Sequence, residues 1–175
     1  DYNGMNIDAK NLLATLLRYS GKTAEARRIA SEVVTIDPLN YYATRELVKL
    51  GTKPEAEFTK LLRGVSESYL ELALYYMNNG FSADTEEVLN EAETIRPYPT
   101  VEYYLGYLAD KRGEKETAAE WFSKAESGSI DYVFPFRLET VKVYEKALEY
   151  IPESANTWYY LGDLYYQKQP DKAMD

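Results

Sequence analysis

Four segments of the chain share one pattern of residues at fixed spacing. Each contains a Leu followed by a small residue, at Leu13-Ala14, Leu72-Ala73, Leu105-Gly106 and Leu161-Gly162. A turn residue comes eight positions after that Leu, at Gly21, Gly80, Gly113 and Gln169. A small residue comes 13 positions after it at Ala26 and Ala118, with Thr85 departing, and a Pro comes 25 positions after it at Pro38 and Pro97, with Ile130 departing. Recurrence at several offsets together predicts a repeated structural unit.

Each feature of this unit has a role in a helical hairpin. A small residue lets two antiparallel helices approach closely, Gly supplies the positive φ that closes the first helix, and Pro ends the second. A hairpin buries one face internally and the other against its neighbour, so the copies must stack. The sequence therefore predicts an all-α fold, a right-handed α-α superhelical solenoid, with helix in more than about two-thirds of the residues.

These offsets resemble the tetratricopeptide repeat, a 34-residue helix-turn-helix unit. The interval from Leu72 to Leu105 is 33 residues, whereas the two flanking intervals are 59 and 56 residues, so only the middle one equals a single repeat. We expect one array over residues 1–175, divided as follows: repeat 1 about 7–38, a degenerate short pair 39–64, repeat 3 about 66–97, repeat 4 about 99–127, an inserted loop and unpaired helix 128–152, and a partial repeat 155–175. The short pair is predicted as helices over 40–50 and 55–62 around a turn at 51–54.

A narrower resemblance covers essentially the whole chain. The strings IDPLNYYATRELVKLG, PTVEYYLGYLADKRG and DYVFPFRLETVKVYEKALEYIP, the last being the most specific, resemble the C-terminal repeat region of large bacterial proteins. The front region of those proteins is galactose-mutarotase-like, carbohydrate-associated and of unknown function. The resemblance implies that this chain is the helical part of a carbohydrate-linked bacterial protein, with any sugar chemistry outside it. The abrupt ends of the chain also lead us to expect an excised piece.

Composition excludes several classes of function. The chain has no His and no Cys, which removes imidazole and thiolate metal sites and the Ser-His and Cys-His nucleophiles. Its net charge of −9 argues against nucleic acid, and no apolar run suggests membrane insertion. Acidic residues such as Glu91 and Glu93 are interpreted as a solvated helix face instead of catalytic carboxylates. We expect no enzyme activity and no cofactor or metal; the compartment stays open, cytoplasmic or extracytoplasmic.

Tyrosine is the unusual component, with 18 residues, several of them in pairs. In a tetratricopeptide hairpin the first helix lines a concave groove, and a helical wheel selects the residues on its open face. That face predicts a partner-binding groove formed by Leu70, Leu74, Met77, Asn78, Tyr103, Tyr107, Lys111, Tyr159, Asp163 and Tyr166. Tyr76, Tyr104 and Tyr160 fall on the packed side. The alternative is that the groove tyrosines pack between neighbouring helices.

The leading functional hypothesis is therefore a protein-interaction or scaffolding module that binds a segment of a protein, or of its own full-length chain, in this groove. The alternative is a structural helical domain that packs against the catalytic or sugar-binding region of a larger carbohydrate-active protein. Residues 65–175 hold ten Lys and Arg and 21 Asp and Glu, which gives −11 and favours a basic partner.

Two segments carry expectations of their own. The apolar loop at 128–136, with Ile130, Tyr132, Val133, Phe134 and Phe136, is expected to fold back over the array and fill the place of a missing first helix. The C-terminal helix, with its aromatic residues, is expected to support dimerisation of the chain.

Overall fold

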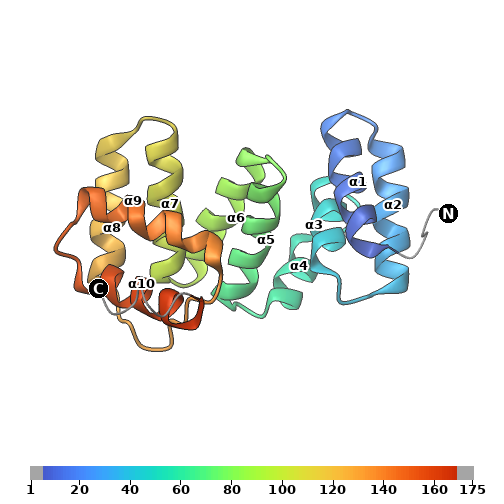
Figure 1. Ribbon diagram of the computed structural model, residues 1–175. Helices are drawn as coiled ribbons and strands as arrows, with labels where there is room; N and C mark the ends of the chain where they lie inside the picture. The colour runs from blue at the N-terminus through green and yellow to red at the C-terminus, as the bar shows by residue number, and fades with distance from the viewer. Residues whose placement is uncertain (1–5, 169–175) are drawn as a thin grey trace. The chain divides into compact units, whose positions relative to one another are not determined.

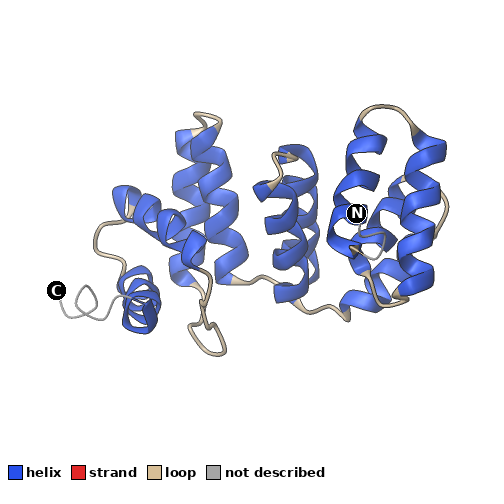
Figure 2. Ribbon diagram, turned by 45° about the vertical axis from the view of Figure 1, so that its right-hand side comes forward, coloured by secondary structure: helices blue, strands red, loops and turns tan. Residues whose placement is uncertain are grey.

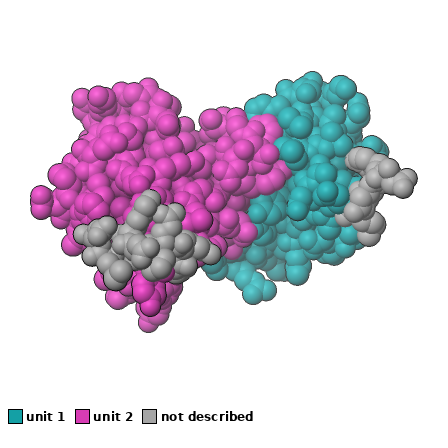
Figure 3. All heavy atoms as spheres, in the orientation of Figure 1, with its two compact units in different colours: residues 1–65 teal, residues 66–175 magenta. Residues whose placement is uncertain are grey.

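The computed structural model describes residues 6–168, and the chain divides into two compact units, Asp1–Val65 and Ser66–Asp175 (Figure 3). Helix accounts for 76% of the described residues, which contain no strand. These two facts confirm the predicted all-α fold built of helix pairs.

The first unit contains two helix pairs (Figure 1). The first pair is α1 (Ile7–Tyr19) and α2 (Thr23–Ile36), and the second is α3 (Tyr41–Lys49) and α4 (Glu55–Leu62). Its core is aliphatic and consists of Ala14, Ile29, Ala30, Val33, Ala43 and Leu47. Asn40 caps α3 by accepting a hydrogen bond from the Ala43 backbone N–H at 2.9 Å. The short helices predicted over 40–50 and 55–62 are confirmed as α3 and α4.

The second unit begins with two hairpins, α5 (Ser66–Asn78) with α6 (Ser82–Ile95), and α7 (Pro99–Lys111) with α8 (Lys115–Ser127) (Figure 2). A loop then leads to a short 3-10 helix, η1 (Leu138–Thr140), and to α9 (Val141–Tyr150). Helix α9 lies across α7 and α8 and contacts both (Figure 1), and α10 (Ala155–Lys168) packs on α9 and α8. The last predicted turn, at Gln169, and the helix expected after it lie outside the described residues.

The repeated glycines close the first helix of three pairs in the same way. Gly21, Gly80 and Gly113 have φ values of 73°, 81° and 81°, in the left-handed region that favours glycine. After each of them the next backbone N–H turns back to a carbonyl five residues earlier, as from Glu114 to Ala109 at 3.0 Å. These are Schellman-type helix ends. The turn that the spacing predicts is therefore confirmed at three positions.

The small residues of the repeat lie where helices meet. Ala26, Thr85 and Ala118, at the third offset, are all fully buried. Thr85 departs from the pattern at little cost because its hydroxyl donates to the Phe81 carbonyl at 3.0 Å. A Cβ added at Gly106 would stand 2.7 Å from the ring of buried Phe122 on α8, whereas a Cβ at Gly162 would meet no atom of the described residues within 4 Å. Only Gly106 of these two glycines is required by packing.

This difference gives a matched pair of substitutions. Gly106→Ala should destabilise the chain by about 1 to 2 kcal/mol, because overpacking against Phe122 outweighs the gain in helix propensity. Gly162→Ala should stabilise it by about 0.5 to 1 kcal/mol, because alanine is the better helix former and nothing obstructs its methyl group. Urea unfolding measures both. The same sign for the two variants would contradict the packing described here.

Candidate functional site

The predicted groove is partly buried in the structure. Leu70, Leu74 and Tyr103 are buried, with Tyr103 at 0% exposure. Placing them on an open face was therefore wrong. The tyrosines assigned to the packed side, Tyr76, Tyr104 and Tyr160, are fully buried as expected.

Helix α9 is the physical reason why Tyr103 is buried. Its Tyr144 ring packs edge-on against Tyr103, with 5.0 Å between ring centroids. Its Lys142 lies 5.9 Å from the centroid of the Tyr107 ring, and Tyr150 donates a hydrogen bond to Asp110 at 2.6 Å. The face of α7 that a partner would occupy in an open groove is thus covered by the chain's own helix.

The other predicted groove residues remain at least partly accessible. Met77 and Tyr107 are half-buried and Asn78 and Lys111 are exposed, while the Lys111 ammonium lies 5.2 Å from the Tyr107 ring centroid. On α10, Tyr159 and Tyr166 are exposed and Asp163 is half-buried.

The loop before η1 carries three exposed aromatic residues. Tyr132, Phe134 and Phe136 are 82%, 71% and 62% exposed, and Leu138 and Ile130 are also exposed. Within the loop, Val133 and Pro135 are buried. The expectation that this loop fills the place of a missing helix is wrong, because α9 covers α7 and the loop runs along the ends of α5 and α7. Sequence reasoning identified the loop but assigned it to the core.

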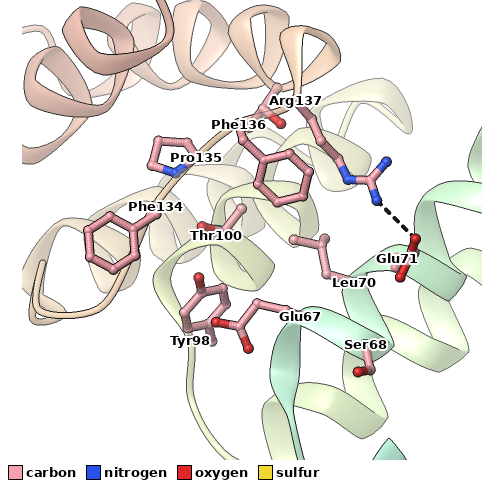
Figure 4. A pocket seen from close by; sticks show the side chains of 11 residues that line it. Glu67, Ser68, Leu70, Glu71, Tyr98, Thr100, Phe134, Pro135, Phe136 and Arg137 are labelled. Carbon is pink, nitrogen blue, oxygen red and sulfur yellow. Dashed lines mark hydrogen bonds and ion pairs between the residues drawn. The ribbon is translucent and has the colours of Figure 1, made fainter. Parts of the chain in front are cut away.

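A pocket of about 240 Å³ lies between this loop and the first turns of α5 and α7 (Figure 4). The loop supplies Phe134, Pro135, Phe136 and Arg137, and η1 supplies Thr140. Helix α5 supplies Glu67, Ser68, Leu70 and Glu71, while Tyr98 and Thr100 come from the start of α7. We call this the loop pocket. Figure 4 shows the rings of Phe134, Phe136 and Tyr98 around one space, with the Glu67 carboxylate beside Tyr98.

Arg137 holds the C-terminal side of the loop in place. Its guanidinium pairs with Glu71 at 3.3 Å and with Glu139 at 3.8 Å, and it lies 5.1 Å from the centroid of the Phe136 ring. On the opposite wall, burial and the neighbouring Glu67 carboxylate raise the pKa of Tyr98 well above its usual value. Tyr98 therefore stays a neutral phenol that can donate a hydrogen bond to Glu67.

A second pocket of about 260 Å³ adjoins the first, and Glu67 and Tyr98 line both. It also contains Glu102, whose pKa is raised by burial and by the neighbouring Glu93. Lys124 ties these two acids together, at 2.5 Å from Glu93 and 3.5 Å from Glu102. Glu93 is thus part of a link between α6, α7 and α8, and its assignment to a solvated face was wrong.

In the first unit, two residues of α1 bind an internal carboxylate. Glu46 of α3 accepts hydrogen bonds from the Thr15 hydroxyl at 3.0 Å and from the Arg18 Nε at 2.6 Å. Asn11 beside them is also buried. A partner's terminal carboxylate would therefore have to displace Glu46 to reach this face.

Within residues 6–168, no group of three or more Asp and Glu side chains is placed to hold a metal ion. None of the helices in that range is long and apolar enough to cross a membrane.

No protein-family model matches the chain, and no curated protein is found to match it. Among solved structures, two crystal structures of MamA are similar. One has 20% sequence identity and a TM-score of 0.43 over 93% of this chain and 97% of the other. The second has 18% identity and a TM-score of 0.36 over 96% of this chain and 86% of the other. Likeness at this level assigns no function.

Proposed function

We propose that the chain is a non-catalytic protein-interaction module whose second unit binds a segment of a partner protein at the loop pocket. The observation that carries this proposal is the exposure of Tyr132, Phe134 and Phe136 next to a preformed pocket. Contiguous exposed apolar side chains on a folded protein are typical of interaction surfaces. Aromatic residues are also the side chains that most often dominate binding energy.

The loop is held at both ends, which favours binding. Val133 is buried, and Arg137 is fixed by its ion pairs with Glu71 and Glu139. Phe134 and Phe136 lie on either side of Pro135, whose ring restricts the backbone between them. A partner that contacts these rings would therefore order little additional chain, and less of the interaction energy would be lost to conformational entropy.

The accessible residues of the predicted groove would form a secondary contact surface. Met77, Asn78, Lys111, Tyr159, Asp163 and Tyr166 retain accessible surface and could contact the outer parts of a long partner. Residues 1–175 would act together as one array. The acidic charge of −11 over residues 65–175 favours a basic partner, whose association should slow as salt is added.

A second candidate is that the same surface packs against another region of a larger carbohydrate-active protein. The observation that favours it is the position of the string DYVFPFRLE. This string is the most specific part of the resemblance to bacterial proteins with a galactose-mutarotase-like front region, and it forms the exposed loop. An interdomain contact would require exposed residues that are specific to proteins with that front region, and this string fits both conditions.

The test is a selection of random displayed peptides on the purified chain. We expect enriched peptides that bind the wild type and lose at least about tenfold in affinity for the Phe134→Ala/Phe136→Ala double variant. Circular dichroism and thermal unfolding confirm that the variant is folded. Enrichment of peptides that bind both proteins equally, or no enrichment at all, would contradict the proposal.

Self-association through α10 is a separate proposal. Trp158, Tyr159 and Tyr166 are exposed on this helix, and a shared apolar face of this kind supports a two-fold symmetric contact. Sedimentation should show a weight-average mass that rises with concentration, and Tyr159→Lys/Tyr166→Lys should abolish that rise. A monomer at all concentrations would rule this out.

A further inference from the structure

We propose that the loop pocket takes a cationic side chain, so that the partner segment presents a Lys or Arg there. This inference rests on the proposed function, because it specifies the chemistry of the partner at the same site. It follows from the composition of the pocket walls and from a contact that the chain already makes within them.

The walls combine aromatic rings with carboxylates. Phe134, Phe136 and Tyr98 line the pocket together with Glu67 and Glu71 (Figure 4). Aromatic faces carry a negative quadrupole that attracts ammonium and guanidinium groups, and several rings around one space form an aromatic cage. A carboxylate at the edge of such a cage adds direct charge complementarity.

The charges in the pocket are not all balanced internally. Arg137 is paired with Glu71 and Glu139, which leaves its own charge compensated. Within the described part of the chain, Glu67 makes no ion pair, and its neighbour Tyr98 is a neutral phenol. Glu67 is also exposed, so an incoming cation can reach its carboxylate. The uncompensated charge of the pocket is therefore negative.

The chain's own contact shows which groups these rings accept. The Arg137 guanidinium lies 5.1 Å from the Phe136 ring centroid, within the range of a cation–π contact. Phe134, on the other side of Pro135, is exposed and faces the same space. At about 240 Å³ the pocket is smaller than the roughly 300 to 1,000 Å³ of sites for drug-sized molecules. That size suits one side chain.

Tetramethylammonium is a direct probe, and tert-butanol is its uncharged counterpart of similar shape. We expect tetramethylammonium, titrated at constant ionic strength, to shift the ring proton NMR signals of Phe134, Phe136 and Tyr98 in a saturable way. tert-Butanol should bind about two- to fivefold more weakly, the difference expected of an exposed cation–π contact.

Two substitutions locate the effect. Phe134→Leu keeps apolar bulk but removes the ring, and Glu67→Gln removes the charge at nearly constant shape; both should weaken tetramethylammonium binding. Glu153→Gln, at an exposed carboxylate in the loop before α10, should leave it unchanged. Equal shifts with tert-butanol, or no shifts, would overturn the inference. If selected peptides then still bind the loop without a basic residue, the proposed function stands and only the cation preference fails.

Discussion

Replacing Tyr103 with alanine should lower the free energy of unfolding by about 3 to 5 kcal/mol, the cost of removing a fully buried aromatic side chain. Its ring contacts those of Tyr144, Tyr160 and Phe122, at centroid distances of 5.0, 6.1 and 6.4 Å. Its hydroxyl also shares a 2.8 Å hydrogen bond with Thr157 of α10. The substitution would thus leave a cavity where α7, α8, α9 and α10 meet. Urea unfolding, followed by circular dichroism, measures the change.

Phe134→Ala is the matched control for Tyr103→Ala. Both residues are aromatic and belong to the second unit, but Phe134 is exposed. Its replacement should change the free energy of unfolding by no more than about 0.5 kcal/mol, as for most surface substitutions. If Phe134→Ala cost as much as Tyr103→Ala, the loop would be part of the core and could not serve as a free binding surface.

Glu46→Ala should destabilise the first unit by about 3 kcal/mol, because it removes a buried carboxylate that pairs with Arg18 and accepts a hydrogen bond from the Thr15 hydroxyl. The Glu46 side chain is 2% exposed. Glu57→Ala removes an exposed partner of Lys53 and should cost no more than about 0.5 kcal/mol.

Glu46→Gln serves as an intermediate case. It retains an acceptor for Thr15 but not the charge that faces Arg18, so its cost should lie between those of the two alanine variants. Thermal unfolding of all three proteins gives the order directly. Equal stability of the Glu46→Ala and Glu57→Ala variants would mean that the contacts of Glu46 with α1 do not stabilise the first unit.

The parts of the fold that depend on local sequence could be predicted from it. Gly21, Gly80 and Gly113 mark helix ends because only a residue without a side chain adopts their left-handed conformation easily. Leu-small pairs mark buried helix positions at Ala14 and Ala73 and a close helix contact at Gly106. Helix α9 was also predictable as a helix, since Val143, Tyr144 and Ala147 repeat at helical spacing and are buried.

The position of α9 could not be predicted in the same way. The sequence indicates an apolar face on this helix but not which surface that face covers. A repeat pattern predicts packing neighbours only for helices that have the repeat's residues. Helix α9 is not such a copy, and it covers the Tyr103 face of α7. The position of the loop could not be predicted for the same reason. Phe134 and Phe136 are apolar enough for a core, but α9 already covers the surface that they were expected to fill.

We expect the loop, and not the predicted groove, to bind the partner. Affinity of one selected peptide for two double variants, measured by calorimetry, tests this claim most directly. We expect Phe134→Ala/Phe136→Ala to weaken binding at least about tenfold and Tyr107→Ala/Tyr159→Ala to weaken it less than about twofold, with both variants folded. Loss of binding in the Tyr107/Tyr159 variant, with full affinity retained in the Phe134/Phe136 variant, would contradict the claim.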